Sequence, residues 1–167
     1  MHAFEELVQQ GTEFSLAALN EAHVKVVEAL EAGTATRLVK ALQMLQLQKA
    51  VLAVGMFSVF DAMLQDALDC NDGFREATVL LDRRGAVDLS ERFGDLQLAI
   101  NVLKHGLGRS YDALVAKAGA LPFRIKRPDE GFFNEGDVAE VLTLIEVDDA
   151  FVRSCAAVIR EVSDALS

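Results

Sequence analysis

The sequence predicts a mainly α protein, an antiparallel bundle of five or six helices in a single domain spanning residues 1-167. With two prolines, one tyrosine and no tryptophan, the composition favours helices over a sheet-rich fold. At 51% hydrophobic side chains, a chain of 167 residues can bury one sizeable core. Apolar residues also recur at helical spacing along most of the chain, so we expect the helices to be amphipathic.

The first expected helix runs over about residues 3–32, within an N-terminal helical region at 1-33. Gly11 can bend it, and Gly33 is expected to end it. Its predicted buried stripe recurs every three or four residues. The members are Phe4, Leu7, Val8, Phe14, Ala18, Ala22, Val26 and Leu30.

The second expected helix is capped by Thr34 or Thr36 and reaches about Leu68. Residues 50–64 are apolar almost all round, and one neighbouring helix cannot cover such a surface. This segment therefore predicts either the central helix of the bundle or a subunit interface. Because the chain is too small to surround it fully, we expect a homodimer. The predicted buried stripe is Leu38, Leu42, Leu45, Leu52, Met56, Val59 and Met63.

Residues 71–73 read as a turn, and a short helix over 74–84 should end at Gly85. The next expected helix reaches His105. It opens with a capping box at residues 88–91, in which Asp88 replaces the usual hydroxyl residue. Its stripe of Phe93, Leu96, Ile100 and Leu103 should face the core.

After a turn at Gly106, Ser110 is expected to cap a helix over 111–118. Residues 122–128 alternate like an edge strand, and residues 141–147 are rich in β-branched side chains. A small β-hairpin near 122-147 is therefore expected. Asp148 or Asp149 should cap the last helix, whose stripe is Phe151, Cys155, Val158, Ile159 and Val162.

The formal charge of -10 argues against broad, nonspecific binding to nucleic acid. Residues 104–127 nevertheless carry six Lys or Arg against one acid, and residues 128–149 carry eight acids and no base. Pairing of these opposite charges across the hairpin is the favoured structural interpretation. A local site for RNA or phosphate is the alternative.

Neither a metal site nor a cofactor is expected. The two cysteines, Cys70 and Cys155, lie far apart, match no metal spacing and are expected to be reduced and buried. No His follows a Glu at the three-residue spacing of helical di-metal sites. The longest apolar run, residues 50–60, is shorter than the roughly 20 residues that span a bilayer. With no signal peptide features at the N-terminus, the expected location is cytoplasmic, without a membrane partner.

Residues 100–105 read Ile-Asn-Val-Leu-Lys-His near a helix end. Asn101 and His105 stand at the spacing of the signature of the HEPN family, in which an Arg, usually followed by Asn, Asp or His, precedes a His by five positions. Here Ile100 occupies the Arg position. Residues 57–64 are similar to the aromatic, small and acidic pattern of that family's core helix. With the closing amphipathic helix, the chain resembles a HEPN-type protein over residues 36-165.

This resemblance implies a helical bundle, often a dimer whose signature helices meet in a cleft, and in active members a metal-independent endoribonuclease. His105 would transfer the proton, and Asn101 would be its positioning neighbour. Loss of a cation that stabilises a transition state costs orders of magnitude in rate. With Ile100 in place of that cation, we expect a non-catalytic HEPN-like dimerising and binding module. It would be associated with RNA or a nucleotide in stress response or defence.

Lys104, Arg109, Ser110 and Tyr111 are the predicted binding residues around this signature. Two alternatives stay open for the whole protein. One is an endoribonuclease that uses His105 with Arg109 as a substitute cation; the other is an unrelated helical module that binds a partner protein. Locally, His105 can be a plain helix-end residue that interacts with the helix dipole. Residues 106–110 can be a plain turn or a phosphate-binding loop.

Overall fold

The computed structural model describes residues 2–32, 36–130 and 143–167, and these ranges contain six helices. The protein is therefore mainly α, as predicted. The helices are α1 (His2–Glu31), α2 (Thr36–Leu68), α3 (Gly73–Arg83), α4 (Val87–His105), α5 (Arg109–Ala116) and α6 (Asp149–Leu166).

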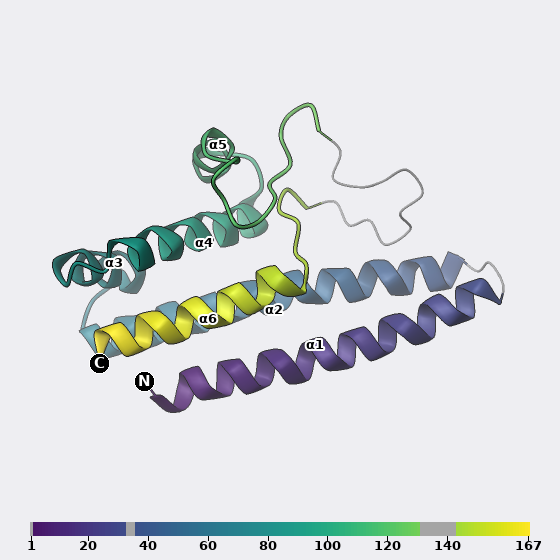
Figure 1. The fold of residues 1–167 in the computed structure, drawn as a ribbon, viewed down its shortest axis with the longest axis horizontal. Coiled ribbons are helices and arrows are strands. Elements are labelled where there is room, and N and C mark those ends of the chain that lie inside the picture. The colour runs from purple at the N-terminus through teal and green to yellow at the C-terminus, as the bar shows by residue number, and fades with distance from the viewer. Residues whose placement is uncertain (1, 33–35, 131–142) are drawn as a thin grey trace.

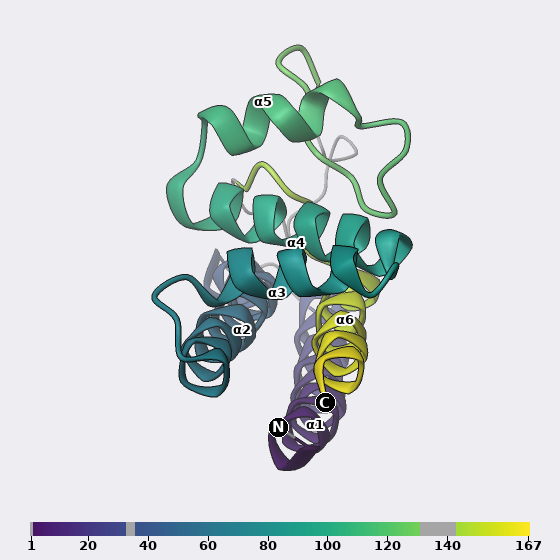
Figure 2. The ribbon, with the colours of Figure 1, turned by 90° about the vertical axis from the view of Figure 1, so that its left-hand side faces the viewer.

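The three long helices α1, α2 and α6 pack against one another, and α1 runs antiparallel to the other two (Figure 1). Helices α3 and α4 lie across one side of this group and contact both α2 and α6. Figure 2 shows α5 on the outside of α4, which makes it the outermost layer. The opposite side of the molecule, where α1 meets α2, has no further helix over it in the described ranges.

Aromatic rings fill the centre of the core. Phe57, Phe60 and Phe93 are fully buried, and the ring of Phe93 lies 6.3 Å from that of Phe57 and 6.2 Å from that of Phe60. The predicted α4 stripe is confirmed at Phe93, Leu96 and Ile100, while Leu103 is half-buried. These contacts hold α4 against α2.

The predicted stripe of α1 is wrong at three positions, Leu7, Phe14 and Ala18, all of which are exposed. Leu7 and Phe14 are 66% and 77% exposed, and the residues that α1 buries are Glu5, Val8, Thr12 and Leu16. The reason is that α1 carries apolar residues on two opposite sides. Periodicity cannot tell which side meets α2 and α6, since that choice depends on the neighbouring helices.

Helix α2 is the central helix of the bundle and contacts α1, α3, α4 and α6. Of its predicted stripe, Leu42, Leu45 and Met56 are buried, whereas Val59 is 51% exposed. Within the described residues α2 is the one helix long and apolar enough to cross a membrane by length and composition. The predicted cytoplasmic location stays a prediction.

One predicted helix cap is confirmed by the structure, and another is wrong. Asp148 caps α6, because its carboxylate accepts a hydrogen bond of 2.7 Å from the backbone N–H of Phe151. The predicted capping box at Asp88 is wrong. Helix α4 has already begun at Val87, and the Asp88 carboxylate instead accepts from the Arg92 guanidinium at 3.0 Å.

Ser110 does not cap α5, contrary to prediction. The helix begins one residue earlier, at Arg109, with Gly108 at the capping position. Gly108 has a φ of +152°, which a residue with a side chain rarely adopts. Within the part of the chain that the structure describes, no side chain caps the start of α5.

The predicted β-hairpin is reduced to one antiparallel bridge between Ile125 and Ile145. The N–H of Lys126 donates to the carbonyl of Leu144 at 2.9 Å, and the N–H of Glu146 donates to that of Arg124 at 3.1 Å. Residues 131–142 of the predicted hairpin lie outside the described residues. The bridge holds the segment after α5 against the segment that leads into α6.

Both cysteines are free, as expected. Cys155 is buried in the core, and burial raises the pKa of its thiol. Cys70 is half-buried rather than buried.

Candidate functional site

The predicted site residues lie where α4 ends and α5 begins. Helix α4 ends at His105 because Gly106 adopts a φ of +74°, and the N–H of Gly106 closes the last turn on the carbonyl of Val102 at 2.8 Å. The chain then turns through Leu107 and Gly108 into α5. The two helix ends therefore share one short turn.

The turn lines a shallow, open pocket, called the hollow below, of about 310 Å³. Asn101 and His105 lie one helical turn apart on the same face of α4, and Arg109 comes from the first turn of α5. Three of the predicted site residues are thereby brought together, and Ser110 borders the same hollow. The full lining is Asn101, His105, Gly106, Leu107, Gly108, Arg109 and Ser110.

Ile100 faces away from this hollow and into the core. It is 3% exposed and belongs to the same buried cluster as Phe93 and Leu96. The position that carries Arg in the HEPN signature is therefore occupied here by a packing residue. A cation for the hollow has to come from another position.

The hollow combines several groups that can meet an anion. The first backbone N–H groups of a helix have no partner within that helix, and no side chain in the described ranges caps the start of α5. Arg109 forms no ion pair among residues 2–32, 36–130 and 143–167. His105 and Lys104, in the last turn of α4, also interact favourably with the negative end of that helix, so their placement has a structural explanation too.

Two predicted binding residues do not line the hollow. Tyr111 is 6% exposed, and its hydroxyl donates a hydrogen bond of 2.7 Å to the backbone carbonyl of Lys126. It therefore ties α5 to the segment that follows. Lys104 is exposed on α4 but lies outside the lining of the hollow.

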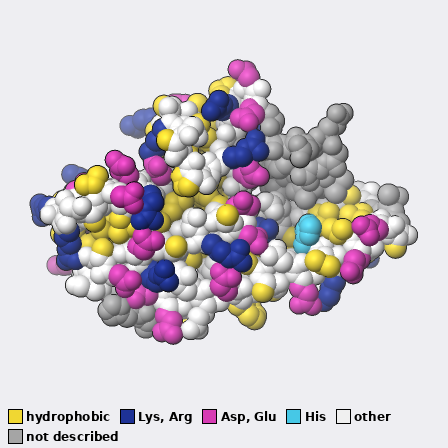
Figure 3. Space-filling view, viewed as in Figure 1, with side chains coloured by type: hydrophobic (Ala, Val, Ile, Leu, Met, Phe, Trp, Pro, Cys, Tyr) yellow, Lys and Arg dark blue, Asp and Glu magenta, His cyan; other side chains and the backbone are white. Residues whose placement is uncertain are grey.

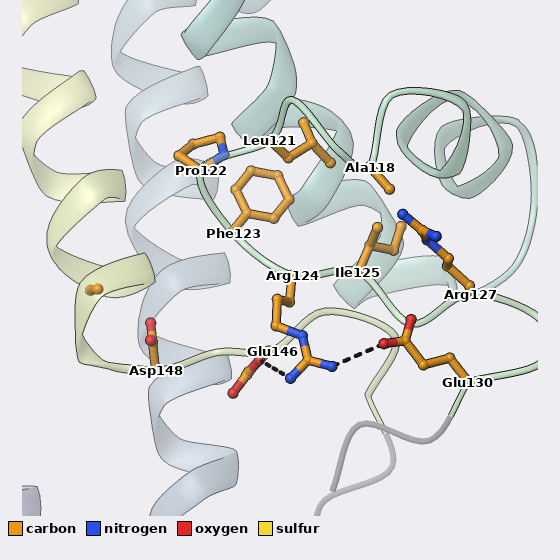
Figure 4. Close-up of a pocket in the computed structure, with 11 residues that line it drawn as sticks. Ala118, Leu121, Pro122, Phe123, Arg124, Ile125, Arg127, Glu130, Glu146 and Asp148 are labelled. Atoms are coloured by element: carbon orange, nitrogen blue, oxygen red, sulfur yellow. Dashed lines mark hydrogen bonds and ion pairs between the residues drawn. The ribbon is translucent and has the colours of Figure 1, made fainter.

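The remaining basic residues after α5 include side chains that pair with acids. Arg124 lies 3.0 Å from Glu130 and 3.5 Å from Glu146 (Figure 4). Lys117 forms an ion pair with Asp95 of α4. Internal charge pairing between the basic and acidic segments is therefore confirmed at Arg124, whereas Lys117 pairs with an acid outside residues 128–149.

Figure 4 also shows that this pairing occurs at the rim of a second hollow, of about 610 Å³, between the segment after α5 and the start of α6. Because Arg124 is engaged by two carboxylates there, its charge is already largely neutralised. Figure 3 shows acidic and basic side chains interspersed over one face of the molecule. This face offers no extended basic surface for nucleic acid.

The described residues contain no candidate metal site. Within the residues that the structure describes, no group of three or more His, Cys, Asp or Glu side chains is placed to hold a metal ion.

Sequence reasoning predicted a second kind of surface only in part. Phe14 of α1 and Val51 of α2, both exposed, line a shared apolar hollow of about 370 Å³. Phe14 was interpreted as part of the core, whereas the all-round apolar surface of residues 50–64, which includes Val51, was interpreted as a central helix or a subunit interface.

No protein-family model, no curated protein and no solved structure matches this chain. The resemblance to the HEPN family therefore rests on the residues quoted above.

Proposed function

We propose that this protein is a non-catalytic, HEPN-like helical module that acts as a homodimer and binds a phosphate group of RNA or of a nucleotide at the turn between α4 and α5. One observation carries the proposal: α4 exposes Asn101 and His105 at a hollow while it buries Ile100 in the core. The binding groups of the signature are accessible, but the position of its cation is not.

The hollow suits a small anionic group. His105 and Arg109 can donate hydrogen bonds to phosphate oxygens, and the free N–H groups of the first turn of α5 can add to them. A protein with a charge of -10 can make few phosphate contacts. Binding should therefore be modest and should weaken as salt rises.

Cleavage requires more than binding. The attack of an RNA 2′-hydroxyl on its phosphate builds negative charge, which active sites stabilise with positioned cations. Since Ile100 is packed against the core, the signature supplies no cation beside His105. Binding without cleavage is the function that this arrangement supports.

A metal-independent endoribonuclease is the second candidate, and one observation favours it. Arg109 lines the same hollow as His105, so it can act as the substitute cation. The two candidates differ in what Arg109 does: in the first it holds a phosphate, and in the second it also lowers the barrier to cleavage.

The test is a titration of fluorescently labelled single-stranded RNA with the protein, followed by anisotropy at low salt. We expect saturable binding that Arg109→Ala and His105→Ala each weaken several-fold. Arg83→Ala is the matched control, because Arg83 is also an exposed arginine but lies at the end of α3. Absence of binding by the wild type, or an equal loss in the Arg83→Ala variant, would contradict the proposal and favour an unrelated protein-interaction module.

A further inference from the structure

The largest feature that the proposed site does not use is an exposed apolar face on α1 and α2. Between Lys40 and Asp66, every exposed residue of α2 is uncharged. We define the apolar face by its large exposed side chains, which come from both helices. They are Leu7, Phe14, Met44, Leu47, Val51 and Val59.

The two helices present these residues side by side. The Oγ1 of Thr12 donates a weak hydrogen bond of 3.2 Å to the Sδ of Met56, which shows that residues 12 and 56 lie side by side in the antiparallel register of α1 and α2. In this register Phe14 and Val51 line one hollow, together with the small side chain of Ala18. The apolar face is therefore continuous across the junction of the helices.

Two glycines lie on the outer side of the same helices. A Cβ atom at Gly11 or at Gly55 would meet nothing within 4 Å. Glycine inside a helix costs about 1 kcal/mol relative to alanine. The missing side chains leave room for a second backbone or an aromatic ring to approach these helices closely.

The area of the face is close to what a dimer interface needs. Given roughly 150–220 Å² for a fully exposed apolar residue, the six residues together expose on the order of 600 Å². Stable monomers seldom leave a larger contiguous apolar patch uncovered. Each subunit of a standard interface contributes about 800 Å².

We propose that a second copy of this chain covers the apolar face, in a two-fold symmetric contact between the α1–α2 pairs. Phe14 is exposed and lies one helical turn after Gly11 on α1. A two-fold axis that passes between these two residues would therefore place Phe14 of each copy over Gly11 of the other. Because the α2 part of the face is uncharged, contact between the α2 helices of two copies of this acidic chain brings no like charges together. On α1, the exposed Glu13 pairs with Arg153 and the exposed Glu21 pairs with Lys25 of the same chain.

The chemistry of the surroundings favours a protein over a lipid surface. Helices that lie on membranes are rich in Lys and Arg beside their apolar face, whereas the exposed positions of α2 between Met44 and Ala62 carry none. The inference deepens the proposed function by naming the surface through which copies associate. It does not depend on the hollow between α4 and α5.

Sedimentation velocity over a range of micromolar concentrations tests this interface. We expect the wild type to form dimers and Phe14→Glu and Val51→Glu to raise the dimer dissociation constant at least tenfold. Both side chains are more than half exposed, so the monomer should keep its circular dichroism spectrum. Val87→Glu is the control, because Val87 is 55% exposed at the start of α4, outside the face. It should dimerise like the wild type.

Three results would overturn the inference, and they can be told apart. A dimer that survives both Phe14→Glu and Val51→Glu would mean that copies associate through another surface, which leaves the proposed function standing. A monomeric wild type would remove the dimer from the proposed function as well. A monomer that co-sediments with phosphatidylcholine vesicles through this face would assign it to a lipid surface.

Discussion

The carboxylate of Asp149, in the first turn of α6, forms an ion pair with Lys49 of α2, with 2.8 Å between Oδ1 and Nζ. The side chain of Lys49 is 16% exposed, so the pair is largely shielded from solvent. The other carboxylate oxygen of Asp149 accepts a hydrogen bond of 2.7 Å from the amide of Asn20 in α1. One residue thus joins the three long helices.

Replacement of Asp149 by Asn should destabilise the fold at neutral pH. Burial by itself would raise the pKa of Asp149, but hydrogen bonds from Lys49 and Asn20 and the charges of Lys49 and Arg153 outweigh it and lower the pKa. The variant leaves Lys49 without its counter-charge. We expect a loss of about 1–3 kcal/mol in the free energy of unfolding, measured by urea denaturation at pH 7.

The pH dependence follows from the direction of this shift. A lowered pKa in the folded state means that Asp149 stabilises the protein above its unfolded pKa of about 4 and loses this contribution as pH falls through the folded value. The difference between the wild type and Asp149→Asn should therefore shrink in acid. Asp66→Asn, at an exposed site on α2, should show no such difference, and a gap that stays constant down to pH 3 would contradict the account.

Ile100→Arg tests whether the position of the missing cation belongs to the core. Because Ile100 is 3% exposed, the variant buries an unpaired charge and should lose a few kcal/mol of unfolding free energy. Chemical denaturation measures this loss. Asn101→Arg adds the same charge at the next, exposed residue and should change stability little. If Ile100→Arg keeps its stability and gains RNA cleavage, the core assignment is wrong.

Tyr111→Phe separates a structural role from a ligand contact. The variant removes the hydrogen bond to the carbonyl of Lys126, so we expect a loss of about 1 kcal/mol in the free energy of unfolding. RNA binding, measured by anisotropy, should not change. Weaker binding with unchanged stability would instead make Tyr111 a contact of the ligand.

The features that could be predicted from the sequence are those set by local chemistry. Gly106 ends α4 and Asp148 caps α6, because a left-handed turn and an N-terminal cap each depend on one residue and its immediate neighbours. The burial of Ile100 also follows from a clear stripe with Phe93 and Leu96. These local signals place Asn101 and His105 correctly at the end of a helix.

The remaining features depend on contacts between distant segments. Phe14 was expected in the core, yet it is exposed because α2 and α6 cover the other side of α1. Asp88 was expected to cap α4, but the helix starts earlier and Asp88 pairs with Arg92, which also bonds Glu161 of α6 at 2.6 Å. Neither outcome follows from spacing along the chain, since both depend on which helices become neighbours.

The most direct test of the central claim, binding without cleavage, is incubation of labelled RNAs of varied sequence with excess protein in EDTA, followed by denaturing electrophoresis. With Ile100 buried and Arg109 as the cation that lines the hollow with His105, we expect the RNAs to stay intact and the wild type to match His105→Ala. Anisotropy on the same samples should show that the wild type binds. Robust cleavage that His105→Ala abolishes would contradict the account and make the protein a metal-independent ribonuclease.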